Sequence, residues 1–249
     1  MKKPLMSAIA VFTVIAGIAQ QEDTRYYELR TYHTNEGKRP ELIQRFQNHT
    51  LALFEESGME NIAYFLPLDS ENQTLVYFLA YPDKASREVM WKKFLENPKW
   101  KAAYQKSIEN GKLVAKIDEV YLRIAPELNH ELPAQQAKDD TVFELRTYYC
   151  LPDKLDDLHA RFRDHTLKLF EKHGMANIVY WLTDEKDGAQ SKLVYLLAHQ
   201  SMDAAKASWE NFRTDPEWIR ARDASEVDGK IVEKVESLYL KALPFSAIK

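Results

Sequence analysis

The segment YELRTY at residues 27–32 returns as FELRTY at residues 143–148, 116 positions later. A longer stretch, HTLALFEESGMENIAYFL at residues 49–66, returns as HTLKLFEKHGMANIVYWL at residues 165–182, with 12 of 18 residues identical. Shared amphipathic patterning does not produce identity at that level, so the chain is an internal duplication whose two copies fold alike. From Leu75 onward the offset becomes 118, which places two extra residues near Asp187 and Gly188 and predicts a hairpin tip there.

Residues 1–19 have the pattern of a secretory signal peptide. Two lysines precede an apolar stretch at residues 5–18, and Gly17 and Ala19 are small residues of the kind that a signal peptidase accepts. The alternative is a membrane anchor, but the apolar stretch is shorter than the ~20 residues that a bilayer helix needs. We therefore expect cleavage near Ala19 and a secreted or periplasmic mature protein without stable membrane insertion.

The composition excludes several classes of function. Cys150 is the only cysteine, so no intrachain disulfide can form. The matching residue in the first copy is Thr34, so a mechanism that uses a thiol could operate in the second copy alone. Removal of Lys2 and Lys3 with the signal peptide takes the formal net charge from −4 to −6, and no basic run suggests nucleic acid as a partner. The motifs for a phosphate loop, a zinc site or a serine nucleophile are absent from the sequence, so we predict no metal, flavin or nucleotide.

Each copy has the same predicted order of elements. In the first copy these are a strand at 27–32, a helix through 42–54 closed by Gly58, a hairpin of strands at 62–66 and 75–81, a helix at 84–96, a second helix started by Asn97 and Pro98, and a strand at 113–124. The order β-α-β-β-α-β is the ferredoxin-like arrangement, an α+β fold with helices on one face of the sheet.

The helix-free faces of the two sheets must be covered, and each copy can cover the other. We predict tandem ferredoxin-like domains at residues 25–125 and 141–245, packed sheet to sheet as an intrachain α/β barrel. The polar segment 126–140, bounded by prolines, is predicted to be a linker long enough for this packing. Glu28, Arg30 and the residues that match them in the second copy are expected on the helix-free face.

These motifs together resemble the NIPSNAP domain of the dimeric α/β-barrel superfamily. They are the opening YELRTY, the Phe46-x-x-His49-Thr50 segment with Gly58 and Asn61, and the Trp91-x-x-Phe94 pair followed by Asn97-Pro98-x-Trp100, each seen twice. The resemblance covers both copies and implies a ferredoxin-like dimeric barrel made within one chain. The superfamily includes small monooxygenases, haem-degrading enzymes and ligand-binding proteins, so it implies no single reaction and supplies no agreed catalytic residues. The predicted signal peptide is a departure, because the better-known members look mitochondrial or cytosolic.

Only two of the seven histidines, His49 and His165, occupy matching positions. At helical spacing from Phe46 and Leu53, His49 is predicted to point inward toward the sheet. A histidine in such an apolar pocket could act as a general base, as an axial haem ligand or as a hydrogen-bond donor to a bound carbonyl. The alternative is a core histidine bonded to a backbone carbonyl or to Thr50.

Glu28 and Arg30 stand two apart on the first strand and share a face, as do Glu144 and Arg146 in the second copy. If that face is the interior of the barrel, Glu28 would pair with Arg146 and Glu144 with Arg30 in a symmetric clasp, because an unpaired buried charge is costly. The alternative is that Arg30 and Arg146 bind an anion.

Other recurring polar residues are weaker candidates for ligand contacts. Tyr32 and Tyr148 suit either a wet cavity or a packed core. Asn61 and Asn177 open a strand in each copy, where an amide can contact a ligand or satisfy the local backbone. The recurring tryptophans are predicted to pack in the core: Trp91, Trp100, Trp209 and Trp218.

These observations predict an exported barrel protein that holds a small apolar or aromatic ligand between its first helix and the sheet, once per copy. If the ligand is turned over, the resemblance implies cofactor-independent oxygenation or isomerisation, with His49 or His165 as the base. The alternatives are a non-catalytic binding or scaffolding module of the cell envelope, and a haem-handling protein. We predict no cofactor, and haem is the cofactor that the last alternative would require. The sequence does not determine whether the chain forms homo-oligomers.

Overall fold

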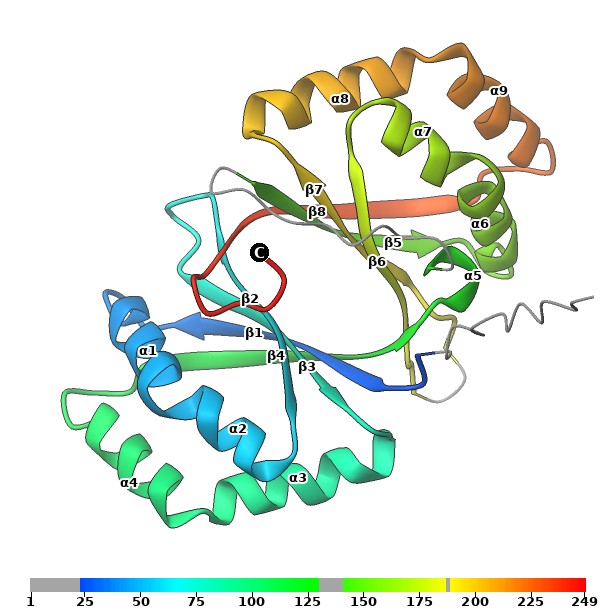
Figure 1. Cartoon of the computed structure of the whole chain (residues 1–249). Coiled ribbons are helices and arrows are strands. Elements are labelled where there is room, and N and C mark those ends of the chain that lie inside the picture. The colour runs from blue at the N-terminus through cyan, green and yellow to red at the C-terminus, as the bar shows by residue number, and fades with distance from the viewer. Residues whose placement is uncertain (1–22, 130–140, 187–188) are drawn as a thin grey trace, which may run out of the picture.

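The computed structural model describes residues 23–129, 141–186 and 189–249, and it shows two similar halves whose sheets meet at the centre while their helices lie outside (Figure 1). The predicted signal peptide, residues 130–140 of the predicted linker, and the two extra residues at 187–188 lie outside the described residues.

The first half follows the predicted order. Its elements are β1 (Tyr26–Thr34), α1 (Arg39–Arg45), a π-helical turn η1 (Phe46–Thr50), α2 (Leu51–Ser57), β2 (Glu60–Pro67), β3 (Thr74–Tyr81), α3 (Lys84–Glu96), α4 (Pro98–Ser107) and β4 (Val114–Ile124). The local signals act as expected: Gly58 ends α2 with a φ of 101°, and the Asn97 side chain accepts the Lys99 N–H at the start of α4.

The second half repeats this order after a short connecting helix. Its elements are α5 (Pro126–Asn129), β5 (Val142–Cys150), α6 (Leu155–Arg161), η2 (Phe162–Thr166), α7 (Leu167–Lys172), β6 (Ala176–Thr183), β7 (Leu193–His199), α8 (Met202–Thr214), α9 (Pro216–Ser225) and β8 (Val232–Ala242). In the described part of the chain, no helix has both the length and the apolar character required to cross a bilayer.

The eight strands close into one barrel in the order β1-β3-β2-β8-β5-β7-β6-β4, with β4 returning to β1. The two four-stranded sheets join through β2 with β8 and through β4 with β6, each junction being antiparallel. This confirms the predicted intrachain barrel. Each junction is short, pairing three residues of β2 with β8 and three residues of β4 with β6, and closure covers these parts of the two sheet edges.

The interior of the barrel is apolar and is shared by both halves. Tyr27 and Leu29 of β1 face it, together with residues of the other half such as Phe143, Leu145 and Trp181. On the opposite face of β1, Tyr26 and Tyr32 belong to a separate core beneath the helices of the first half. Side chains therefore fill most of the barrel, except for a pocket of about 240 Å³ lined by residues such as Leu29, Leu145 and Val194, and the charged face of β1 lies under the helices.

The predicted ion pairs between the two copies do not form. Glu28 pairs with Arg30 of its own strand, and Arg146 pairs with Glu144 at 2.6 Å. Strand periodicity correctly predicted which side chains share a face, but it cannot tell which face the helices cover. Since the charged face lies under the helices, these pairs never meet across the barrel.

The chain segments that follow the last strands exchange contacts between the halves. Beyond β8, Leu243 donates its N–H to the Tyr64 carbonyl at 2.8 Å, and the Ser246 hydroxyl accepts the Tyr64 N–H at 3.0 Å. In the other half, the side-chain oxygen of Asn129 accepts the Tyr180 N–H at 3.0 Å. Residues 126–129 of the predicted linker are therefore a structured helix, α5, that holds the second half to the first.

Candidate functional site

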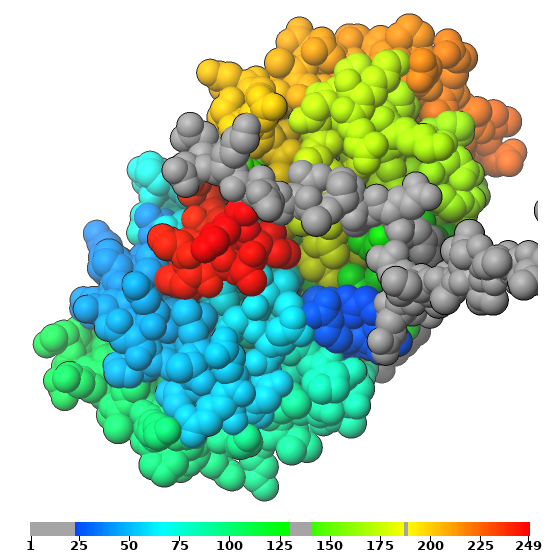
Figure 2. Space-filling view, viewed as in Figure 1, coloured from blue at the N-terminus to red at the C-terminus, as the bar shows by residue number. Residues whose placement is uncertain are grey.

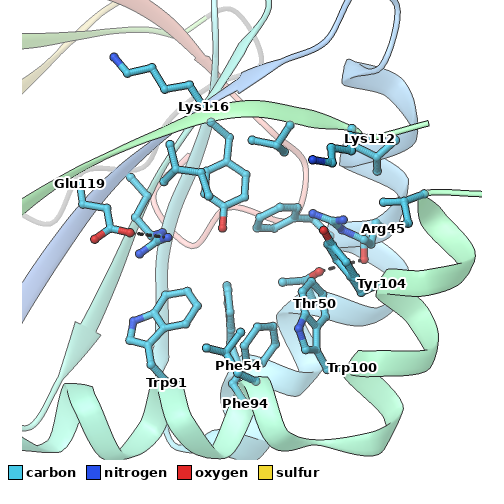
Figure 3. A pocket seen from close by; sticks show the side chains of 18 of the residues that line it. Arg45, Thr50, Phe54, Trp91, Phe94, Trp100, Tyr104, Lys112, Lys116 and Glu119 are labelled. Atoms are coloured by element: carbon cyan, nitrogen blue, oxygen red, sulfur yellow. Dashed lines mark hydrogen bonds and ion pairs between the residues drawn. The ribbon is translucent and has the colours of Figure 1, made fainter.

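A cavity of about 760 Å³ lies in the first half, between the sheet and helices α1 to α4 (Figure 3). Its volume and largely apolar walls fall in the range of small-molecule sites. We call it the first-half cavity. Aromatic side chains make up much of its wall: Tyr32, Phe46, Phe54, Trp91, Phe94, Trp100 and Tyr104.

The π-helical turn η1 places part of this wall. The N–H of Leu51 reaches back to the Phe46 carbonyl, and the Thr50 hydroxyl donates to the Arg45 carbonyl at 3.3 Å. Such a turn holds one residue more than an α-helical turn, and it occurs frequently at functional sites. Arg45, Phe46 and Thr50 are all buried and all line the cavity.

Because of this turn, the prediction that the two histidines point inward is wrong. His49 and His165 are exposed on the outer side of η1 and η2. In a regular α-helix His49 would follow Phe46 on the inner side, but the additional residue in the turn rotates His49 outward and brings Thr50 inward. His165 instead lines a separate surface pocket between α7 and α9.

A buried charged cluster forms one end of the first-half cavity. The Glu28 carboxylate has no solvent exposure and accepts hydrogen bonds from Arg87 at 2.8 and 2.9 Å, from Tyr81 at 2.6 Å and from Trp91 at 3.1 Å, and it also pairs with Arg30. Burial alone would raise the pKa of Glu28, but the Arg87 bonds and the Arg30 charge outweigh it, so the pKa lies below its ordinary value. Glu28 is therefore ionised, and the surrounding donors occupy its carboxylate oxygens. We call such a buried carboxylate with its hydrogen-bond donors an anchor.

The second half builds the same anchor from different residues. Glu144 is bound by Trp209 at 2.7 Å, by Ser237 at 2.6 Å and by His199 at 2.9 Å, in addition to Arg146. Burial opposes ionisation, but the His199 bond and the Arg146 charge lower the pKa of Glu144 to about 2. A pocket of about 430 Å³, here called the second-half pocket, lies beside this anchor. It includes none of the matches to Arg45, Phe46 or Thr50.

At the other end of the first-half cavity lies Arg45, which the sequence analysis did not single out. Its guanidinium lies against the rings of Trp100 and Tyr104, 5.2 and 5.6 Å from their centroids (Figure 3). Burial lowers the pKa of Arg45, although the neighbouring tyrosines oppose this. A repeat comparison could have found the site, because Ile108 and Tyr104 in the first copy align with Glu226 and Arg222 in the second.

The other predicted ligand contacts divide into two groups. Arg30 and Tyr32 line the first-half cavity, and Arg146 lines the second-half pocket. Tyr148 packs against Phe162 with ring centroids 5.6 Å apart. The structure thus brings Arg30 and Tyr32 together with aromatic side chains that we had expected to serve only as core packing.

Asn61 and Asn177 take the local role that the sequence analysis gave as their alternative. Asn61 donates to the Leu51 carbonyl at 3.1 Å, and Asn177 donates to the Leu167 carbonyl at 3.0 Å. Both amides also accept the hydroxyl of a tyrosine three residues later on the same strand. They fix the start of β2 and β6 against the preceding helix, and neither lines the first-half cavity.

Binding of a metal ion, or axial ligation of haem, requires side chains that can act as ligands. Within the described ranges, no group of three or more His, Cys, Asp or Glu side chains is arranged to hold a metal ion. None of the described residues that line the first-half cavity is a histidine, a cysteine or a methionine. The haem alternative relied on His49 or His165 as the axial ligand, and their outward placement does not fit that role.

Comparison with known proteins agrees with this architecture. A sequence profile of the NIPSNAP family matches residues 27–127 and again residues 143–247, one match for each copy. Among curated proteins, none matches the sequence.

Three solved structures share the whole two-domain barrel. An anthrone oxidase-like protein superposes with a TM-score of 0.59 at 13% identity, covering 89% of this chain and 92% of the other. A proposed monooxygenase from Lactobacillus acidophilus NCFM gives 0.56 at 12% identity, with 88% and 94% covered. A second proposed monooxygenase, from Fusobacterium nucleatum, gives 0.54 at 12% identity, with 88% and 93% covered. At these identities the similarity shows the fold and not the reaction.

Proposed function

The chain belongs to the NIPSNAP family, and we propose that it binds a small aromatic or apolar molecule in the first-half cavity. The observation that carries this proposal is the cavity itself, about 760 Å³, which lies between the helices and the sheet, is lined by aromatic rings and is partly open to solvent. A concave site of this size, with apolar walls and a few polar groups, has the character of a small-molecule site.

The two halves do not contribute equally to this function. The second-half pocket is smaller, about 430 Å³, and is lined largely by charged and polar side chains such as Lys206, Glu210 and Arg213. The first-half cavity has Leu95 where Arg213 stands and Tyr104 where Arg222 stands. We therefore expect one ligand per chain, in place of the one per copy that the duplication suggested.

Binding is the activity that we propose for the cavity. The sequence-based mechanism needed His49 or His165 as a base beside the ligand, and neither reaches the cavity. Among the described lining residues, the carboxylates are Glu88 and Glu119, and Glu119 forms an ion pair with Arg30 at 2.8 Å. The proposal is thus closest to the non-catalytic binding module considered above.

A matched pair of substitutions tests the location of the site. Val114 lines the cavity, and Val232 is its match in the second copy. Isothermal titration calorimetry with 2-naphthol should give one site per chain in the wild type, loss of binding in Val114→Trp, and unchanged binding in Val232→Trp. Equal affinity in both variants, or no binding by the folded wild type, would contradict the proposal.

Export is a separate proposal, supported by the pattern of residues 1–19. Expression of the full chain in a bacterial host, followed by mass spectrometry of the periplasmic fraction, should give a mature protein that begins at about Gln20. A full-length chain confined to the cytoplasm would argue against export.

A further inference from the structure

We infer that the ligand of the first-half cavity carries a carboxylate group and that Arg45 is the residue that receives it. This inference rests on the proposed function and deepens it, because it assigns the chemical class of the ligand and the end of the cavity where its charged group lies.

Arg45 is a buried cation without an anion. Its residue exposure is 6%, and among the described residues its side chain makes one hydrogen bond, from Nη1 to the Ser107 hydroxyl at 3.1 Å. Its Nε is buried and has no acceptor. None of the described carboxylates forms an ion pair with it, and the aromatic rings that it lies against belong to Trp100 and Tyr104, which are neutral. A buried cation of this kind is destabilising unless an anion compensates it.

In the second half, a carboxylate compensates the charge of the arginine that matches Arg45. Arg161 is the match of Arg45, and it donates to the Ser225 hydroxyl at 3.3 Å, as Arg45 donates to Ser107. Arg161 also forms an ion pair with Glu226 at 3.1 Å. The position that matches Glu226 in the first half is Ile108, which lines the cavity. The Nε of Arg161 is unpartnered too, so the feature that distinguishes the two sites is the missing carboxylate.

The charges around the first-half cavity favour an anion, although the protein as a whole is acidic. Basic lining residues outnumber acidic ones by five to two: Arg30, Arg45, Arg87, Lys112 and Lys116 against Glu88 and Glu119. Both acids are paired with arginines of the lining, Glu88 with Arg87 and Glu119 with Arg30. These two arginines also pair with Glu28, and Lys116 pairs with Asp118 at 2.7 Å. Among the described residues, this leaves Arg45 and Lys112 as the lining bases that form no ion pair with a carboxylate. Figure 3 shows the Lys112 amine on the same side of the cavity as Arg45.

The second half indicates the class of anion. Arg presents a planar set of donors that matches both carboxylate and phosphate geometry, and the group that satisfies the matching Arg161 is the carboxylate of Glu226. Because Arg45 already lies against the rings of Trp100 and Tyr104, its position is restricted before a ligand arrives. The aromatic walls beyond it suit an apolar body. The expected ligand is therefore an aromatic or apolar monocarboxylate.

Calorimetry with two probes of equal size tests this inference. The wild type should bind 2-naphthoate at least tenfold more tightly than the neutral 2-naphthamide, the ratio expected for one charge-assisted hydrogen bond. Arg45→Gln should remove this preference. Ile108→Glu should remove it as well, because it gives Arg45 the internal partner that Glu226 gives Arg161. The double variant Arg161→Gln/Glu226→Gln should keep the wild-type preference.

The outcomes separate this inference from the proposed function. Equal binding of acid and amide by the wild type overturns the inference while leaving an aromatic site in place. No binding of either probe by the folded wild type contradicts both. Should Arg45→Gln fail to fold, the Ile108→Glu variant decides alone, since it adds a partner and leaves Arg45 intact, and an unchanged preference in that variant would also overturn the inference.

Discussion

The ring of Phe78 on β3 stacks on Trp181 of β6, with centroids 4.9 Å apart and planes 13° apart. The two residues come from different copies, and both are fully buried inside the barrel. The contact shows that the two halves share the core inside the barrel, in addition to the core that each has beneath its own helices. The space-filling view shows the C-terminal segment, in red, lying on the blue and cyan surface of the first half (Figure 2).

Removal of the indole from this shared core should destabilise both halves together. We expect Trp181→Ala to lower the free energy of unfolding by about 3–5 kcal/mol, because a large buried ring is replaced by a cavity. Urea unfolding followed by circular dichroism checks this, and a single cooperative transition is expected. Two separated transitions would show that the halves unfold independently.

The buried anchor of the second half should make stability depend on pH. The pKa of Glu144 is about 2 in the folded protein, against an ordinary value of 4.5. Its ionised form therefore stabilises the fold above about pH 4.5, and this contribution, about 3 kcal/mol at most, is lost as pH falls toward 2. Glu144→Gln should lower stability at pH 7 and flatten its dependence on pH in urea titrations.

A control for that experiment is Glu233→Gln, which removes one negative charge from an exposed position of β8. It should leave both the stability at pH 7 and its dependence on pH close to the wild type. If Glu144→Gln behaved like this control, the anchor would have no role in stability.

The C-terminal segment should be required for stability of the first half. The Ser246 hydroxyl accepts the Tyr64 N–H, Ile248 donates its N–H to the Ile62 carbonyl at 3.2 Å, and Phe245 packs on the Tyr64 ring with centroids 5.4 Å apart. Deletion of residues 244–249 should lower the free energy of unfolding by about 2–4 kcal/mol, from lost hydrogen bonds and ring packing. Deletion of Lys249 alone serves as the control, and hydrogen exchange at Tyr64 should quicken only in the longer deletion.

The repeated histidines should be dispensable for ligand binding. His49 and His165 are exposed and do not line the first-half cavity. The double variant His49→Ala/His165→Ala should bind 2-naphthol with the wild-type Kd, within a factor of about 2, since surface substitutions have small effects. A loss of tenfold or more in affinity would show that these histidines contribute to the binding site.

The sequence predicted the architecture well because its strongest signals are local or repeated. Alternating and helical periodicities, together with Gly58 and the Asn97-Pro98 start, gave the order of elements in each copy. The match between copies then required two similar sheets that cover each other. The closed order of strands confirms that step.

The candidate site was harder to predict, because small geometric choices decide it. The sequence showed that Glu28 and Arg30 share a face but not that the helices cover it. It gave a helical stripe containing His49 but not the π-helical turn that rotates His49 outward. One signal was present and unused: the exchange of Glu226 for Ile108 between the copies.

By itself, then, the sequence determined the duplication, the ferredoxin-like units and their closure into one barrel, because repeated motifs and hydrophobic periods are properties of the chain alone. Only the tertiary structure decided which face of β1 meets the helices, which side of η1 faces the sheet, and that Arg45 lies buried without a carboxylate. The orientation of β1 and the burial of Arg45 depend on distances between elements far apart in the chain. The exchange of Glu226 for Ile108 marks the missing carboxylate in the sequence, but only the structure shows that Arg45 lies beside it.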